Sequence, residues 1–206
     1  EGIPVAVEVF KGSTGDPATL ASQVTKLKER FGLAHVALVG DRGMITKARI
    51  KDDLKPAELD WITALRGPAI KALMTGGTIQ PTLFDQTDMA EITSPDYPGE
   101  RLIACYNPFL AAERARKRGE LLAATEAALA KIAAATRRAR RPLRGQDAIA
   151  LAVGKVINAK RVAKHFLADI TDDGLAWRRD EQKIAEEAAL DGIYVIRTSL
   201  PAGALG

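Results

Sequence analysis

Short apolar stretches alternate with helical patterns over the first part of the chain. Residues 3–10 read IPVAVEVF, in which β-branched side chains recur at alternate positions, and residues 36–39 and 60–65 are further apolar runs. Such runs are typical of β-strands. Between the first two, Leu20 and Val24 lie at helical spacing. This order of strand, helix and strand predicts an α/β fold.

Local signals place the helices of this region. Asp16 precedes Pro17, and a capping carboxylate followed by a proline in the first turn marks the start of a helix. This helix is expected to run to about Arg30, before a glycine stops it. Further short helices are expected through Ala48 and over residues 57–60.

The middle of the chain combines turn signals with one long helical pattern. Residues 79–106 mix short stretches of strand character, such as TLFD at residues 82–85, with turn residues, and predict a small antiparallel patch. From Pro108 to about Arg141, alanine is abundant and leucines lie near helical spacing. One long helix is therefore expected there, and Pro142 stops it.

Three further elements are expected in the last third of the chain. Residues 147–160 have a helical pattern. Residues 162–170 and 175–178 read as the two strands of a hairpin, because an Asp-Asp-Gly turn separates them. Asp180 is expected to cap a helix that runs through Ala189.

The final strand, residues 192–198, predicts a return to the α/β region. We therefore expect residues 1–75 to form part of the core, and residues 76–190 to be an insertion with the antiparallel patch, a long basic helix and the hairpin. Residues 191–206 hold the returning, truncated core strand. The chain has no initiator methionine and stops soon after this strand. A piece of a longer protein is expected on these grounds, although an engineered chain would look the same.

The composition indicates a folded protein without a membrane partner. Apolar residues make up 47% and charged residues 27% of the 206 residues, which allows a buried core and argues against wholesale disorder. No apolar run approaches the roughly 20 residues of a membrane-spanning helix, and the first residues do not resemble a signal peptide. Cys105 is the single cysteine, so a cytoplasmic location is expected.

The positive charge is concentrated in one stretch. The net charge is +4, yet residues 111–144 alone hold 10 basic and 3 acidic side chains. This stretch is either a solvated helix face or a surface that contacts a polyanion such as DNA. Contact of that kind gains affinity from counterion release and does not read sequence. The candidate contacts are Arg114, Arg116, Lys117, Arg118, Arg137, Arg138, Arg140 and Arg141.

Asp41 is the sharpest candidate for a chemical site. It follows an apolar strand and lies between Gly40 and Gly43, where α/β sheets place their functional groups. A carboxylate there suits Mg²⁺ or Mn²⁺, and two such ions support phosphodiester chemistry. One carboxylate alone cannot hold both. The alternative is a turn in which Asp41 accepts local hydrogen bonds. The adjacent Arg42 is a candidate phosphate contact or a member of a surface salt bridge.

Several segments together, in chain order, resemble one family. They include LVGDRGMIT, DWITALR and SPDYPGERLIACYNP. The chain resembles the DDE-class transposases of insertion sequences, in the group related to insertion sequence four. The resembling segments are residues 10–20, 38–46, 60–66, 94–108, 111–122, 153–166 and 185–199.

The resemblance implies an RNase H-like fold with an incomplete mixed-sheet core. In that family three acidic residues bind two divalent cations, Mg²⁺ or Mn²⁺, and Asp41 matches the second of them. The first would precede residue 1. The third, a glutamate in a tyrosine–arginine–glutamate–lysine motif, would follow residue 206. The resemblance therefore implies that the chain is inactive as given.

The same resemblance implies the partners of the intact protein. Family members cut DNA at the element ends and join the 3′ hydroxyl to target DNA, working as dimers on paired ends in the bacterial cytoplasm, at the nucleoid. The alternative function is a non-catalytic DNA- or protein-binding module derived from a decayed mobile element.

The remaining candidates have structural explanations beside their functional ones. Arg197 on the final strand either faces the active site or pairs at the edge of the core. His165, Trp61 and Trp177 are interpreted as structural residues.

Overall fold

The computed structural model describes residues 7–30, 32 and 35–204. The chain divides into two compact units. The sheet unit comprises residues 1–106 and 193–206, and the helical unit comprises residues 107–192. Each unit has its own buried hydrophobic cluster. No helix in the described part of the chain combines the length and apolarity needed to cross a bilayer.

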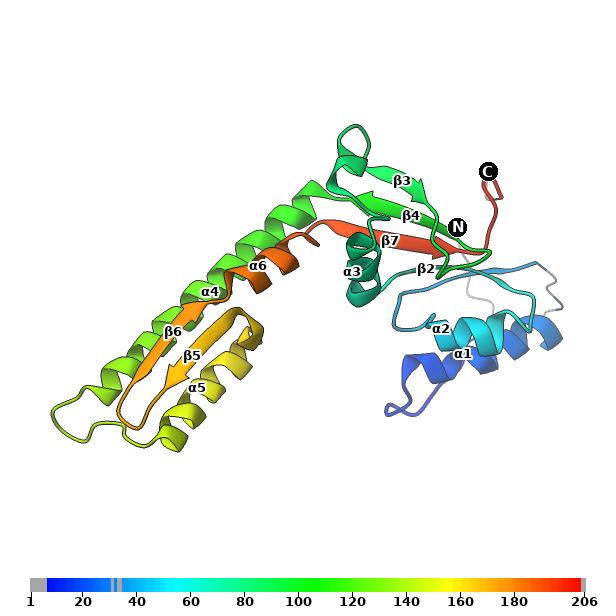
Figure 1. The fold of residues 1–206 in the computed structure, drawn as a ribbon. Coiled ribbons are helices and arrows are strands. Elements are labelled where there is room, and N and C mark those ends of the chain that lie inside the picture. The colour runs from blue at the N-terminus through cyan, green and yellow to red at the C-terminus, as the bar shows by residue number, and fades with distance from the viewer. Residues whose placement is uncertain (1–6, 31, 33–34, 205–206) are drawn as a thin grey trace. The chain divides into compact units, whose positions relative to one another are not determined.

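The sheet unit contains a five-stranded mixed sheet in the order β1-β2-β7-β4-β3. Figure 1 labels β2, β7, β4 and β3 of this sheet. β1 and β2 are parallel, whereas β7, β4 and β3 each run antiparallel to the preceding strand in this order. The expected α/β class with a mixed sheet is confirmed. The strands are β1 (Ala37–Val39), β2 (Asp60–Ala64), β3 (Met89–Ile92), β4 (Arg101–Tyr106) and β7 (Ile193–Thr198).

The final strand lies in the middle of this sheet because it pairs on both sides. Arg197 of β7 lies opposite Thr63 of β2 on one side and Leu102 of β4 on the other. The strands expected as an antiparallel patch, β3 and β4, do pair antiparallel and belong to this same sheet. Leu102 and Val195 are fully buried, as expected for a strand surrounded by neighbours.

Several helical elements accompany the strands of the sheet unit. They include α1 (Asp16–Thr25), α2 (Lys47–Arg49), the π-helical turn η2 (Ile50–Leu54) and α3 (Gly67–Thr75). Leu20 and Val24 of α1 pack in one cluster with Leu54 and Trp61, so the helical spacing read from the sequence matches the buried face. Trp61 is a core residue, as interpreted from the sequence.

The expected strand at residues 3–10 is not formed where the structure describes it. Residues 3–6 lie outside the described residues, and residues 7–10 have no regular structure. Val7 and Val9 are 84% and 91% exposed. Alternating β-branched residues need a neighbouring strand for their backbone groups, and within the described residues no strand pairs with residues 7–10.

Other local predictions in the sheet unit need correction. The first helix has Gly15 as its N-cap and no side-chain cap, so Asp16 is not the cap, although Pro17 does lie in the first turn. Residues 57–60 are not helical, because a turn with Glu58 at φ 54° leads directly into β2. The TLFD segment, predicted as a strand, lies largely in a 3₁₀ helix, η3 (Pro81–Phe84), which its leading proline favours.

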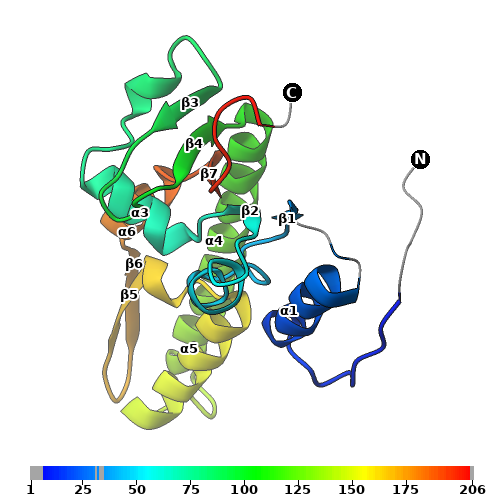
Figure 2. The ribbon, with the colours of Figure 1, turned by 90° about the vertical axis from the view of Figure 1, so that its right-hand side faces the viewer.

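The helical unit packs two helices against a hairpin (Figure 2). α4 (Pro108–Thr136) and α5 (Gln146–Lys160) lie side by side, and β5 (Phe166–Ile170) pairs with β6 (Leu175–Arg179) in a hairpin, as expected from the sequence. The first strand was expected to start at residue 162, but it starts at Phe166, because residues 163–165 form a short 3₁₀ helix, η4 (Ala163–His165). α6 (Glu181–Ala188) follows, and the Asp180 side chain caps it by accepting a hydrogen bond from the Lys183 N–H, as predicted. Trp177 packs against the core of this unit.

The long helix ends five residues earlier than expected. α4 starts at Pro108 behind an Asn107 cap, but it stops at Thr136 rather than at Arg141. The Leu143 N–H donates to the Ala135 carbonyl at 3.0 Å, which folds the chain back toward the helix. Consequently the arginines from position 137 onward lie in a loop and not on a helix face.

Candidate functional site

Asp41 lies at the edge of the sheet where two parallel strands end. β1 ends at Val39, and the Gly40 N–H donates to the Ile62 carbonyl of β2 at 3.1 Å before the chain turns away. β2 ends two residues before Arg66. Because parallel strands end at a common edge, Asp41 and Arg66 come from different strands to the same place.

The Asp41 carboxylate stabilises a tight turn of the backbone that follows it. Its Oδ1 atom accepts hydrogen bonds from the N–H groups of Gly43, at 2.6 Å, and Met44, at 2.8 Å. A Cβ atom at Gly43 would lie only 3.0 Å from this oxygen, so glycine permits the close approach. Of the residues that the structure describes, none donates a hydrogen bond to Oδ2. The local turn, one of the two alternatives for Asp41, is therefore formed, and the second carboxylate oxygen has no donor among the described residues.

The surroundings of Asp41 favour its ionised form. The N–H of Met44 contributes most to lowering the pKa of the carboxyl, followed by the N–H of Gly43, and the charges of Arg42 and Arg66 add to the effect. The group is exposed to solvent. Asp41 is therefore a carboxylate at neutral pH.

A shallow hollow surrounds this carboxylate. The Arg66 Nε–H donates to the backbone carbonyl of Arg42 at 3.3 Å, which ties together the two segments that follow β1 and β2. Arg66 was not predicted as a site residue from the sequence, although its position after the second parallel strand was a usable signal. The hollow is lined by Asp41, Arg42, Gly43, Arg66, Gly67 and Pro68.

The described residues do not fit a two-metal centre by themselves. Among them, no group of three or more His, Cys, Asp or Glu side chains lies close enough together to hold a metal ion. Asp41 supplies one carboxylate, and two arginines next to it disfavour a divalent cation. Mg²⁺ needs near-octahedral oxygen ligation, so any further carboxylate ligands of such a centre would have to come from outside the described residues.

Arg197 is engaged inside the sheet unit. Its guanidinium makes two hydrogen bonds of 2.6 Å to the Glu100 carboxylate, and both side chains are buried. It also lies over the Tyr97 ring, 5.0 Å from the ring centroid. Of the two alternatives left open for Arg197, the geometry is that of pairing at the edge of the core.

The candidate DNA-binding residues on α4 each have a partner within the helical unit. The Arg116 guanidinium bonds to Glu113 and Glu120, and Lys117 shares Glu113 at 3.1 Å. These cations lower the pKa of Glu113 to about 2. Arg114 donates to a backbone carbonyl, that of residue 190, at 3.2 Å. Each of these side chains therefore already has an ion-pair or hydrogen-bond partner within the helical unit.

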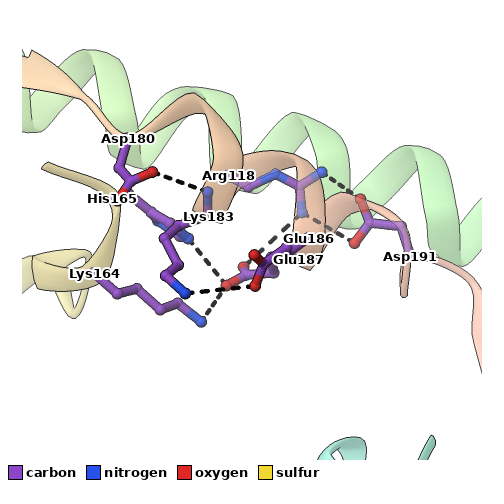
Figure 3. Close-up of polar contacts among 8 residues, drawn as sticks. All are labelled: Arg118, Lys164, His165, Asp180, Lys183, Glu186, Glu187 and Asp191. Carbon is purple, nitrogen blue, oxygen red and sulfur yellow. Dashed lines mark hydrogen bonds and ion pairs between the residues drawn. The ribbon is translucent and has the colours of Figure 1, made fainter. Parts of the chain in front are cut away.

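Arg118 belongs to a half-buried cluster that ties α4 to the elements around α6 (Figure 3). Its guanidinium bonds to the Asp191 carboxylate and lies 3.9 Å from Glu187. Glu187 also pairs with Lys164, and its carboxylate accepts a hydrogen bond from Nε2 of the buried His165 at 3.1 Å. Burial acts to raise the pKa of Glu187, but Lys164 and His165 outweigh it and lower the pKa. This cluster links α4 to Glu187 and Asp191 and to residues 164–165.

The arginines after α4 differ from those on it. All four are exposed, and none pairs with a carboxylate among the residues described. Their loop begins at the end of α4 and leads to α5. These residues are Arg137, Arg138, Arg140 and Arg141.

Two separate features are therefore candidates for a functional site. One is the ionised Asp41 with its neighbouring arginines in the sheet unit, and the other is the set of unpaired arginines in the helical unit. Comparisons with protein-family models, with curated proteins and with solved structures found no match.

Proposed function

We propose that the chain is an inner segment of the catalytic core of a DDE-class insertion-sequence transposase, with an RNase H-like fold. In this proposal Asp41 contributes one of three carboxylates that bind Mg²⁺ or Mn²⁺ in the assembled centre. The observation that carries it is the ionised Asp41 at the common end of two parallel strands of a mixed sheet. Functional groups of α/β sheets gather at that position.

The neighbours of Asp41 support a phosphodiester substrate. Arg42 and Arg66 line the same hollow, and guanidinium groups bind phosphate oxygens well. Asp41 offers Oδ2 as an oxygen ligand while the local turn holds Oδ1 in place. A single carboxylate holds a hard divalent cation poorly. The 206-residue chain should therefore neither cut nor join DNA.

The gene that surrounds this segment tests the proposal. The proposal expects an upstream strand with an aspartate and a downstream helix with the tyrosine–arginine–glutamate–lysine spacing. A longer protein with these segments should nick DNA in the presence of Mg²⁺, and Asp41→Asn should abolish the nicking. Flanking sequence without acidic residues at these places, or nicking that survives Asp41→Asn, would count against the proposal.

A second candidate function has its own supporting observation. The exposed arginines of residues 137–141 have no carboxylate partner among the described residues, and such a surface suits a polyanion without any metal. This arrangement favours a non-catalytic DNA-binding module, derived from a decayed mobile element. Salt-dependent DNA binding without cleavage, even when flanking segments are restored, would favour this second function.

A further inference from the structure

The loop after α4 has a defined shape although its arginines are exposed. The Leu143 N–H bonds to the Ala135 carbonyl, and Leu143 packs against the core of the helical unit. Arg144 donates to the Asp173 carbonyl at 2.7 Å, in the turn between β5 and β6. Arg141 has a left-handed backbone conformation with φ 51°. The loop is therefore anchored at both ends.

Asp172 in the hairpin turn makes two further contacts, to the residues that directly follow the loop. Its backbone carbonyl accepts from the Gly145 N–H at 2.7 Å, and its Oδ1 atom accepts from the Gln146 N–H at 3.1 Å. Gln146 is the first residue of α5, and Gly145 has no side chain that could cap this helix. Asp172 therefore satisfies an orphan donor of α5 from another element.

We infer that residues 137–141 form a surface that binds the phosphate backbone of duplex DNA, and that Asp172 is the positioning residue that holds this surface in shape. The inference deepens the proposed function, since it rests on DNA as the partner. In this inference the four loop arginines contact DNA, whereas the paired cations of α4 do not.

The composition of the loop favours duplex DNA over other polyanions. Residues 137–144 read RRARRPLR and contain no aromatic side chain. Proteins that bind single strands use aromatic side chains on which bases stack. The loop also lacks the exposed apolar face that binding to a membrane surface requires, because its one leucine packs against the core.

Salt dependence of binding tests the surface. The full chain is titrated with a fluorescent 20-base-pair duplex in EDTA at several salt concentrations. Four phosphate contacts give a slope of about −3.6 in the log–log plot, and an affinity loss of about 150-fold between 50 and 200 mM salt. Changing all four loop arginines to Gln should remove this slope. Arg116→Gln, on the same unit, should leave it unchanged because that arginine is already paired.

Variants at position 172 separate shape from charge. Asp172→Ala loses the acceptor for Gln146 and should weaken duplex binding by up to about fivefold, the factor that a typical helix cap represents. Asp173→Ala removes the same charge from the same turn, but among the residues that the structure describes its carboxylate accepts a hydrogen bond only from the Thr171 hydroxyl, so binding should stay equal or tighten. Asp172→Asn restores an acceptor without the charge and should recover full binding.

Defined outcomes would overturn the inference. Equal tightening by Asp172→Ala and Asp173→Ala would show that only charge matters at the turn. If the variant without loop arginines kept the wild-type slope, the surface would lie elsewhere, while DNA would stand as the partner. Tighter binding of single-stranded DNA or RNA would contradict the duplex assignment. Because EDTA removes metals, none of these results depends on Asp41, whose role is tested separately.

Discussion

Replacing Glu100 with glutamine should destabilise the sheet unit far more than the same replacement of a solvent-exposed glutamate. Glu100 and Arg197 are 6% and 7% exposed, and two hydrogen bonds of 2.6 Å join them. Glutamine fills the same space but leaves the guanidinium buried without a counter-charge. Removing one partner of a buried pair typically costs about 3–5 kcal/mol, a large part of the roughly 5–15 kcal/mol that stabilise a domain.

A second pair in the same sheet supplies the matched control. Arg101 bonds to Glu91 with the same two-pronged geometry, at 2.9 and 2.7 Å, but these side chains are 30% and 50% exposed. Exposed pairs contribute about 0–1 kcal/mol because water screens them. Glu91→Gln should therefore lower the free energy of unfolding by less than about 1 kcal/mol.

Urea unfolding followed by tryptophan fluorescence measures both variants. The chain has two tryptophans, of which Trp61 lies in the sheet unit and Trp177 in the helical unit. All variants therefore carry Trp177→Phe, so that the signal reports the sheet unit alone. A loss below about 1 kcal/mol for Glu100→Gln would refute the argument. The double variant with Arg197→Met should recover most of the loss, because it removes the unpaired charge.

Three further predictions concern other parts of the chain. Asp180→Ala should cost about 1 kcal/mol of helical-unit stability, because the Lys183 N–H loses its acceptor; urea unfolding with Trp61 replaced measures it. Carbon-13 NMR should find the Asp41 pKa below the usual aspartate range, and Arg66→Met should raise it somewhat. The pKa of Asp41 is lower in the folded state than in the unfolded state. Any stabilisation by its ionised form is therefore fully present at a pH above the unfolded-state pKa, and it is lost as the pH falls through the folded-state pKa. Arg118→Met should lower the thermal stability of the helical unit yet leave the salt slope of DNA binding unchanged.

Sequence patterns predicted the fold best where a local signal agreed with burial. The strand at residues 60–65, the hairpin around residues 171–174 and the Asp180 cap were all placed correctly. In each, alternation, turn chemistry or a capping side chain acts within a few residues, so no distant partner is needed to decide the structure.

The failures arose where the structure depends on distant residues. Alternation alone predicted a strand at residues 7–10, but a strand also needs a neighbour. Helix propensity carried α4 through residue 141, whereas the contact of Leu143 with the core ends it earlier. Propensity is a weak signal that tertiary contacts override.

The candidate sites show the same limit. Position after a strand identified Asp41, and the same reasoning applied to the next strand would have found Arg66. Whether a basic residue is paired could not be read from the sequence. Arg118 meets its partner 73 residues away, while the arginines of residues 137–141 meet none among the described residues. Only the folded structure shows which basic side chains are paired within the protein and which are exposed for a ligand.

The role of Asp41 as a ligand for a divalent cation is tested most directly by Mn²⁺ broadening in NMR spectra of the 206-residue chain. Weak binding is expected, with the amide signals of residues 41–44 broadened first, and Asp41→Asn should remove this effect while Asp60→Asn preserves it. Broadening that begins elsewhere, that persists in Asp41→Asn, or that reflects tight binding at two sites would contradict the assignment of Asp41 as a lone carboxylate ligand.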